Sequence, residues 1–326
     1  MIITRSPLRI SIGGGGTDLE SYYKHNGGFL ISAAINKYIY VTLTKPFEKG
    51  IYLKYSDIEK TNQIGDVNHG IIREALKIYH KNNPPQIEIT TLADIPAGTG
   101  LGSSSSFTNA LVYGLVSFNK NFIEKKELAE ASCNIEINKL KEPIGKQDQY
   151  ISAFGGITCF DFNKNGNVNV EKLNISQETL LDLEENLLLF FTGFTRSAGK
   201  ILKDQKVKSE ASDNDMISNL NNVKKMGLEI KTLLEDGNTF EFGKILDKHW
   251  QNKRKRSSGM SNPKIDEWYN IAMQNGAVGG KLVGAGGGGF LLFYCKDRLK
   301  LRESMKKSGL EEVHFNFDFE GTKRIL

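Results

Sequence analysis

The sequence has few cysteines and no long apolar run, and both shortages narrow its function. Its three cysteines, Cys133, Cys159 and Cys295, are scattered and form no C-x-x-C pair, which argues against a disulfide framework, a zinc site or a dithiol redox centre. No apolar stretch approaches the roughly 20 residues that cross a bilayer, and the opening MIITRSPLRISIGGGG lacks the apolar core of a secretory signal. We therefore expect reduced, buried thiols and a cytoplasmic protein with no membrane partner.

The excess of positive over negative charge is also small. The 326 residues carry a formal net charge of +5, with lysines spread along the chain. This balance suits a nucleic-acid binder or an enzyme for anionic small molecules, but no nucleic-acid module signature accompanies it, and we expect no nucleic-acid partner. The one dense basic run, Lys253–Arg256, is interpreted as the solvated face of a helix, with an anion funnel as the alternative. Beside it, Trp250 is expected in the core, and His249 has no visible partner.

Glycine, by contrast, is abundant and clustered. Of the 33 glycines, 14 gather in three clusters at residues 13–16, 98–102 and 279–289, and two of these clusters are flanked by strand-like runs, a pattern typical of loops that approach a ligand closely. Periodicity predicts an α+β protein of two domains, residues 1–180 and 181–326, with the boundary between 175 and 187 and an antiparallel sheet in the second. Strands are expected at 7–12, 29–35, 38–47, 86–96, 186–196, on both sides of the last glycine cluster and at 313–319, and helices at 68–80, 106–118, 124–140, within 209–256, at 262–274 and at 297–309.

The segment PAGTGLGSSSS, residues 96–106, is the strongest single motif. It follows a predicted strand and opens a predicted helix, so its backbone N–H groups and the positive end of the helix dipole can hold phosphate. It is not a Walker A loop, because no Gly-Lys-Ser/Thr follows the glycines. A serine-capped helix after a glycine turn is the alternative, but that explains one Gly and one Ser only. The expected phosphate contacts are Pro96, Gly98, Gly100, Leu101, Gly102, Ser103, Ser104 and Ser105.

Two further motifs flank this loop. Pro7-Leu8-Arg9 with Gly13, Gly14 and Asp18 precedes it, and KLVGAGGGGFLLF at 281–293 follows it. In this order the three resemble the motifs of the GHMP kinase family (galactokinase, homoserine kinase, mevalonate kinase, phosphomevalonate kinase) and span nearly the whole chain. The resemblance implies a ribosomal S5-like α/β N-terminal domain and a ferredoxin-like C-terminal domain, with ATP and Mg²⁺ in the cleft between them.

The resemblance also assigns the catalytic groups. In galactokinase-like members an acidic Mg²⁺ ligand lies twelve residues before the catalytic Asp, and Glu136 and Asp148 have that spacing. A carboxylate can take the proton of an attacking hydroxyl, and a second one can complete a Mg²⁺ shell with a serine hydroxyl. We expect Asp148 as the base, Arg9 beside it, and Mg²⁺ on Ser104 and Glu136, with Ser103 as the neighbouring candidate. The alternatives are an exposed helix carboxylate for Glu136 and a surface ion pair for Arg9.

The first motif bears on the substrate. Galactokinases have Gly-Glu-His-Thr-Asp where this chain has Gly14-Gly15-Gly16-Thr17-Asp18, which removes bulk and negative charge and adds N–H groups that can hold an anion. With GKQDQY, FTGFTRSAGKIL and the third motif, the chain resembles the D-glycero-D-manno-heptose 7-phosphate 1-kinases. That resemblance implies transfer to the anomeric hydroxyl, giving the 1,7-bisphosphate for nucleotide-activated heptose and bacterial surface polysaccharide. The expected substrate contacts are Gly14, Gly15, Gly16, Thr17, Asp18, Arg196, Gly286 and Gly287.

Several alternatives stay open. Asp18 also suits an Asx-type cap after the glycine turn, and Arg196 suits an interdomain surface as well as a phosphate contact. The chain also fits a C1 kinase of an unphosphorylated sugar, fucokinase- or galactokinase-like, and less well a non-catalytic ligand sensor, whose phosphate loop or base would be lost. The small-molecule partners are then a sugar phosphate and ATP, and the sequence leaves a homodimer open.

Overall fold

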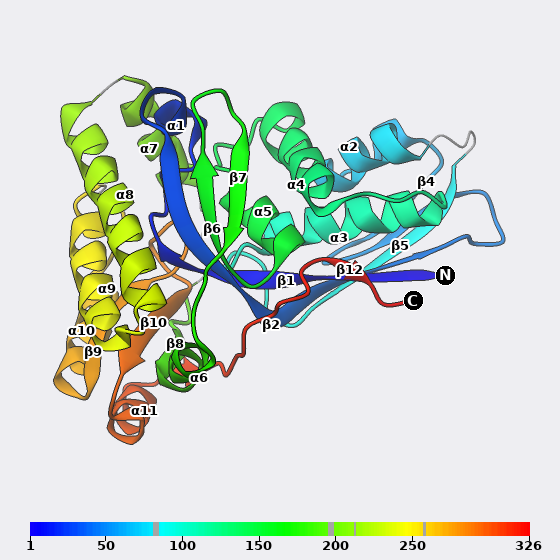
Figure 1. Ribbon diagram of the computed structural model, residues 1–326. Helices are drawn as coiled ribbons and strands as arrows, with labels where there is room; N and C mark the ends of the chain where they lie inside the picture. The colour runs from blue at the N-terminus through cyan, green and yellow to red at the C-terminus, as the bar shows by residue number, and fades with distance from the viewer. Residues whose placement is uncertain (81–84, 195–198, 212, 257–258) are drawn as a thin grey trace.

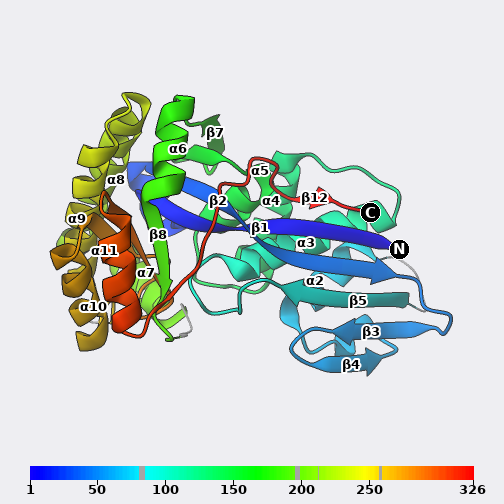
Figure 2. The same ribbon diagram turned by 90° about the horizontal axis from the view of Figure 1, so that it is seen from below.

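The computed structural model describes residues 1–80, 85–194, 199–211, 213–256 and 259–326, and shows two β-sheets with helices packed against them (Figure 1). The first sheet holds β1 to β7 and β12, and the second holds β8 to β11. Seen from below, the two sheets and their helices form two lobes side by side, joined along β1 and β2 (Figure 2). The predicted mixed α+β architecture is confirmed.

Two long strands, β1 (Ile2–Gly13) and β2 (Gly28–Thr44), form the centre of the first sheet. One half of β2 pairs with β5 and the other half with β6, so the sheet divides along it. We predict two strands over this region, but the structure has one, because residues 36–37 are absorbed in a bulge opposite the step from Pro7 to Leu8. The remaining strands are β3 (Gly50–Lys54), β4 (Ile58–Thr61), β5 (Gln86–Ala93), β6 (Ile157–Phe162), β7 (Val168–Lys172) and β12 (Lys323–Arg324).

Helices α2 (Gly70–Tyr79), α3 (Ser103–Phe118), α4 (Lys125–Cys133) and α5 (Gln147–Phe154) share one apolar core with this sheet. The α3 helix is buried on most sides, with Ala110, Leu111 and Leu115 inaccessible to solvent. It begins at Ser103, earlier than predicted, because Gly102 enters it with a left-handed φ of 77°. The short α1 (Glu20–Asn26) and the 3-10 turn η1 (Ile64–Asp66) complete this part.

The predicted helix over 124–140 is interrupted. After α4 the backbone widens into a π-helix, η2 (Asn134–Lys139), a rare form that occurs often at functional sites. Sequence periodicity carries no signal for this change. A second difference is that Asp148, which lies outside the predicted helices and strands, stands in the first turn of α5.

The second sheet is antiparallel, in the order β11-β8-β10-β9, as predicted for this half of the chain. The expected strand–loop–strand around the last glycine cluster is confirmed as β9 and β10. The strand predicted at 313–319 is wrong, because Phe317 forms only an isolated bridge with Ile35. The elements are α6 (Gln177–Asn186), β8 (Leu187–Phe191), α7 (Gly199–Glu210), α8 (Asn214–Glu235), α9 (Thr239–Arg254), α10 (Pro263–Gln274), β9 (Ala277–Leu282), β10 (Phe290–Cys295), α11 (Arg298–Lys307) and β11 (Glu311–Glu312).

The end of the chain, which we predict within the second domain, returns to the first sheet. There β12 pairs with β1, and the two termini lie close together (Figure 1). Among the described helices, none is both long enough and apolar enough to cross a bilayer.

Candidate active site

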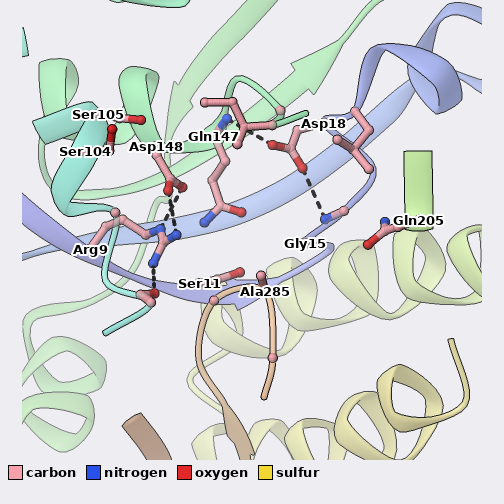
Figure 3. A pocket seen from close by; sticks show the side chains of 18 of the residues that line it. Arg9, Ser11, Gly15, Asp18, Ser104, Ser105, Gln147, Asp148, Gln205 and Ala285 are labelled. Carbon is pink, nitrogen blue, oxygen red and sulfur yellow. Dashed lines mark hydrogen bonds and ion pairs between the residues drawn. The ribbon is translucent and has the colours of Figure 1, made fainter. Parts of the chain in front are cut away.

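A cavity of about 400 Å³ opens between the two sheets and collects segments from both. Its wall includes the end of β1, the loop that leads into α3, the π-helix and the start of α5 from the first half. Helices α7 and α9 and the loop between β9 and β10 come from the second half. Figure 3 shows Asp148 with Arg9 on one side of this cavity and Gln205 on the other, with Asp18 between them.

The glycine- and serine-rich loop forms one wall. Gly98, Gly100 and Gly102 all have left-handed φ values of 77–82°, which a side chain would strain. A Cβ on Gly100 would also lie 3.0 Å from the carbonyl oxygen of Val283, so glycine here lets the two glycine loops meet. Of the eight residues expected on phosphate, six line the cavity, whereas Leu101 is packed in the core and Pro96 lies outside the lining.

Arg9 and Asp148 form a two-pronged ion pair at the bottom of the cavity. The Arg9 Nε donates to Asp148 Oδ1 at 2.8 Å, and Nη2 donates to Oδ2 at 2.7 Å. Nη1 donates to the carbonyl oxygen of Gly100, which fixes the guanidinium against the glycine- and serine-rich loop. Arg9 is 6% exposed, so the surface ion pair considered for it is wrong. The Asp148 side chain keeps 26% of its surface accessible and can meet a ligand.

Glu136 lies on the π-helix and is 1% exposed, so the exposed carboxylate considered for it is wrong too. It accepts hydrogen bonds from Ser104 Oγ at 2.7 Å and from Gln149 Nε2 at 2.8 Å. Burial raises its pKa to about 7, against the lowering effect of the donors. In the described residues no three His, Cys, Asp or Glu side chains gather to hold a metal alone. One carboxylate and one hydroxyl nevertheless fit Mg²⁺, which takes most of its ligands from phosphates and water.

Asp18 is held by the backbone. Its Oδ1 accepts from the N–H of Gly16 and its Oδ2 from the N–H of Gln147, both at 3.1 Å. Burial raises its pKa, with a contribution from the negative charge of Asp148. Gly145 leaves the room for it, since a Cβ there would lie 1.9 Å from Asp18 Oδ2.

Of the remaining residues of the first motif, two line the cavity and two hold the loop in its conformation. Gly15 and Gly16 line the cavity. Thr17 is fully buried and donates to the carbonyl oxygen of Gly14 or Phe29, each at 2.8 Å. Gly14 is packed where a Cβ would meet the Phe29 carbonyl oxygen at 2.1 Å. Both therefore shape the loop, and neither belongs to the cavity lining.

The last glycine cluster closes the cavity from the second sheet. Gly286 lines it, together with Gly284, Ala285 and Gly288. Gly287 instead donates its N–H to the carbonyl oxygen of Met260 at 3.0 Å. Arg196, the remaining expected substrate contact, lies outside the described residues.

The interpretation of the basic run as a solvated face is wrong for two of its four residues. Lys253 and Arg256 are each 6% exposed and line the cavity, while Arg254 points outward and pairs with Asp266 at 2.7 Å. The spacing i, i+4, i+7 aligns His249 with these two cations on one side of the helix and its end. Trp250 is fully buried, as expected.

Sequence reasoning missed several lining residues. Lys281 lies inside the third motif but was not singled out, although a lone charge in an otherwise apolar, glycine-rich strand was a usable signal. It is 1% exposed, and its Nζ donates to the carbonyl oxygen of Ile12 at 3.1 Å. Three polar residues carried no distinctive signal, namely Ser11, Gln147 and Gln205.

Comparisons with known proteins agree with this geometry. The family model for the GHMP kinases N terminal domain matches residues 70–156, and the GHMP kinases C terminal model matches residues 230–309. A D-glycero-alpha-D-manno-heptose 7-phosphate kinase of Campylobacter jejuni is 30% identical over 99% of this chain and 98% of its own length. An L-fucokinase/L-fucose-1-P guanylyltransferase of Bacteroides fragilis is 26% identical over 90% of this chain and 34% of its own length.

Solved structures show the same fold. The structure described as a D-glycero-D-manno-heptose 1-phosphate kinase of Bacteroides thetaiotaomicron superposes with a TM-score of 0.81 over 100% of this chain and 99% of that one, at 24% identity. A putative sugar kinase of Campylobacter jejuni gives a TM-score of 0.78 over 99% and 97%, at 28% identity. The shared fold therefore extends over both sheets.

Proposed function

The chain belongs to the GHMP kinase family, and from that premise we propose that it transfers the γ-phosphate of ATP to the anomeric hydroxyl of D-glycero-D-manno-heptose 7-phosphate. The product is the 1,7-bisphosphate, which would serve nucleotide-heptose and surface polysaccharide synthesis in the cytoplasm. One observation supports the chemistry: a buried arginine holds both oxygens of a partly accessible carboxylate beside the glycine- and serine-rich loop.

Asp148 is the base in this proposal. Its carboxylate takes the proton of the anomeric hydroxyl as that oxygen attacks the γ-phosphorus and the bond to the ADP oxygen breaks. Arg9 orients the carboxylate through its two hydrogen bonds and places positive charge where the transferred phosphoryl group becomes more negative. Since Arg9 also bonds the Gly100 carbonyl, the base and the phosphate loop keep a fixed relation.

The loop from Gly98 to Ser105 and the start of α3 hold the ATP phosphates in this proposal. Left-handed glycines let the backbone come close to the phosphate oxygens, and the positive end of α3 points toward them. Ser104 and Glu136, with Ser103 as a neighbour, would hold Mg²⁺, which neutralises phosphate charge when bound. The hydrogen bond from Ser104 to Glu136 keeps both side chains at the same point of the wall.

Asp18 and the glycines before it take the sugar. Asp18 accepts from ring hydroxyls, because its backbone donors leave lone pairs toward the cavity. The phosphorylated sugar is favoured by the C. jejuni relative, named a heptose 7-phosphate kinase, and by three lysine and arginine side chains in the cavity besides Arg9. The B. fragilis fucokinase relative favours the second candidate, a C1 kinase of an unphosphorylated sugar. A non-catalytic sensor is disfavoured because Asp148, Glu136 and the loop are intact.

Two measurements test the proposal. Asp148→Asn is expected to lower turnover by about 10²–10⁴-fold, the usual contribution of a general base, while the Kd for ATP stays within twofold. An active variant would show that another group takes the proton. In parallel, wild-type kcat/KM is compared for heptose 7-phosphate, mannose-type sugar phosphates and the same sugars without phosphate. Equal turnover of the free sugars and their phosphates would exclude the heptose 7-phosphate assignment in favour of the second candidate.

A further inference from the structure

Three cations are buried together on the second-sheet side of the cavity. Lys253 and Arg256 come from the end of α9 and the residues that follow it, and Lys281 comes from β9. Their exposed fractions are 6%, 6% and 1%, and all three line the cavity. We call Lys253, Arg256 and Lys281 the basic cluster.

Among the described residues, no carboxylate forms an ion pair with the basic cluster, although Asp18 lies near enough for its charge to act on Arg256. The cluster's hydrogen bonds go to neutral oxygens: Lys253 to the carbonyls of Leu282 and Gly284, and Lys281 to that of Ile12. Among the described residues, no carboxylate oxygen lies within 4 Å of these charged nitrogens, in contrast to Arg9 with its partner Asp148. Buried charges are normally paired, because leaving water is costly without an opposite charge. Three buried cations with no carboxylate in direct contact therefore suit an anionic ligand.

Two buried donors also lack acceptors, one within the basic cluster and one on α7. Arg256 Nε donates to Asn219 Oδ1 at 2.7 Å and Nη1 to the Gly15 carbonyl at 3.1 Å, but Nη2 has no partner. Gln205 Nε2, on α7, is likewise buried without a partner, and Gln205 is 2% exposed. Buried donors without an acceptor lower the stability of the fold unless a ligand accepts their hydrogen bonds.

Gly16 lies against both of these side chains. A Cβ on Gly16 would stand 2.6 Å from the unpartnered Gln205 Nε2 and 2.8 Å from Arg256 Nη1, next to the unpartnered Nη2 of the same guanidinium, so any side chain at position 16 would crowd both. Because Gly16 also lines the cavity, its missing side chain leaves the donors open to a ligand.

We infer that Arg256 and Gln205, with the positive charge of Lys253 and Lys281 behind them, hold the phosphate at the end of the sugar remote from the attacked hydroxyl. The inference rests on the proposed function. Position supports it: seen from Asp148, Gln205 lies beyond Asp18 and Gly15, at the far end of the cavity (Figure 3). Asp18 therefore stands between the base and the phosphate donors, where the sugar ring would contact it.

Burial and neighbouring cations lower the pKa values of the cluster. The pKa of Lys281 falls to about 7 and that of Lys253 falls well below its ordinary value, while burial lowers that of Arg256 to about 10 against the raising effect of the Asp18 charge. A phosphate dianion favours the protonated lysines, because it adds opposite charge. The competing occupant is the γ-phosphate of ATP, since Lys281 and Lys253 also feel the charge of Arg9.

Steady-state kinetics separate the two occupants. Arg256→Gln is expected to raise the KM for heptose 7-phosphate about 10- to 100-fold, as for loss of hydrogen bonds to a charged group, with the KM for ATP within twofold. The preference for heptose 7-phosphate over unphosphorylated heptose, as a ratio of kcat/KM, falls by the same factor. The control is Arg254→Gln, two residues earlier on the outward side of α9, which should match wild type. An unchanged sugar-phosphate KM, or an equal rise in the KM for ATP, overturns the inference.

Binding of inorganic phosphate tests the site without turnover. With Mg²⁺ and a non-hydrolysable ATP analogue filling the nucleotide site, phosphate should raise the Tm of the wild type above that in chloride of equal ionic strength. The rise should be lost in Arg256→Gln and kept in Arg254→Gln, and the ligand-free Tm of both variants reports that they fold. A phosphate effect that survives Arg256→Gln contradicts the site.

The two assays also separate this inference from the proposed function. If the wild type prefers heptose 7-phosphate but Arg256→Gln keeps that preference, the function stands and the site is wrong. If the wild type shows no preference yet loses phosphate binding with Arg256→Gln, the anion site stands and the proposed substrate is wrong.

Discussion

Replacing Glu136 by Gln should make the ligand-free protein more stable at alkaline pH, although it removes a proposed metal ligand. Burial raises the Glu136 pKa from 4.5 to about 7. Between these values the folded state keeps a proton that the unfolded state has lost, so stability falls as pH rises through this window. At about 1.4 kcal/mol per pKa unit, the full loss is about 3 kcal/mol, of which roughly 2–3 kcal/mol falls between pH 5 and pH 8.

The amide of Gln keeps the hydrogen bonds while removing the charge. Glu136 accepts from Ser104 and Gln149, and the Ser104 hydroxyl can rotate while Gln149, whose Oε1 has no partner, can turn its amide over. The free energy of unfolding of the variant should therefore be close to that of the wild type at pH 5. At pH 8 it should be more stable by roughly 2–3 kcal/mol, the penalty for ionising the buried acid.

Urea unfolding followed by far-UV circular dichroism, in EDTA and without nucleotide, measures this difference at pH 5, 6, 7 and 8. Glu127→Gln, the same change at an exposed position on α4, is the control and should show a difference from wild type that does not vary with pH. A constant difference for Glu136→Gln, or one that favours wild type as pH rises, would refute the reasoning. Kinase activity of Glu136→Gln should be lost over the whole range if the residue binds Mg²⁺.

Two other substitutions probe the neighbouring groups. Gly145→Ala puts a Cβ 1.9 Å from Asp18 Oδ2 and should displace that carboxylate. The KM for the sugar should then rise about 10- to 100-fold, because hydrogen bonds to a charged group are lost. Gly65→Ala, with open space around its Cβ, is the control, and equal sugar KM values in the two variants would count against Asp18 as a sugar ligand. Arg9→Lys keeps the charge but cannot bond both oxygens of Asp148 at once. Single-turnover rates should therefore fall about 10²-fold or more, with the Kd for ATP nearly unchanged. An undiminished rate would show that the two-pronged contact is dispensable.

The features that sequence reasoning placed well are those fixed by local chemistry. The serine- and glycine-rich loop opens α3 because Gly102 adopts a left-handed φ that glycine readily takes. The spacing of Glu136 and Asp148 was readable, and the structure brings both to one cavity with Arg9. Their burial was not readable, because it depends on strands and helices distant in the sequence.

The basic cluster shows what local patterns cannot supply. From the sequence alone, a run of four basic residues is expected on the protein surface. Only the packing of α9 on β9 determines which two of the four side chains are buried. Gly145 begins the GKQDQY segment, but the sequence alone does not explain why glycine is needed there. The structure explains it, because the Asp18 carboxylate occupies the space that a Cβ would take. The π-helix that carries Glu136 has no sequence periodicity of its own.

The return of the chain end to the first sheet restricts how the cavity can open. The backbone leaves the first sheet after β7 and comes back before β12, where Ile3 donates to Leu326 at 3.0 Å and Ile325 donates to Ile3 at 2.7 Å. The second sheet is therefore joined to the first by two backbone crossings, and side chains of both sheets pack in one apolar core, among them Leu8, Ile10, Leu189 and Leu292. Both features resist a displacement of one sheet relative to the other, so α9 and the last glycine loop keep a fixed alignment with the glycine- and serine-rich loop across the cavity.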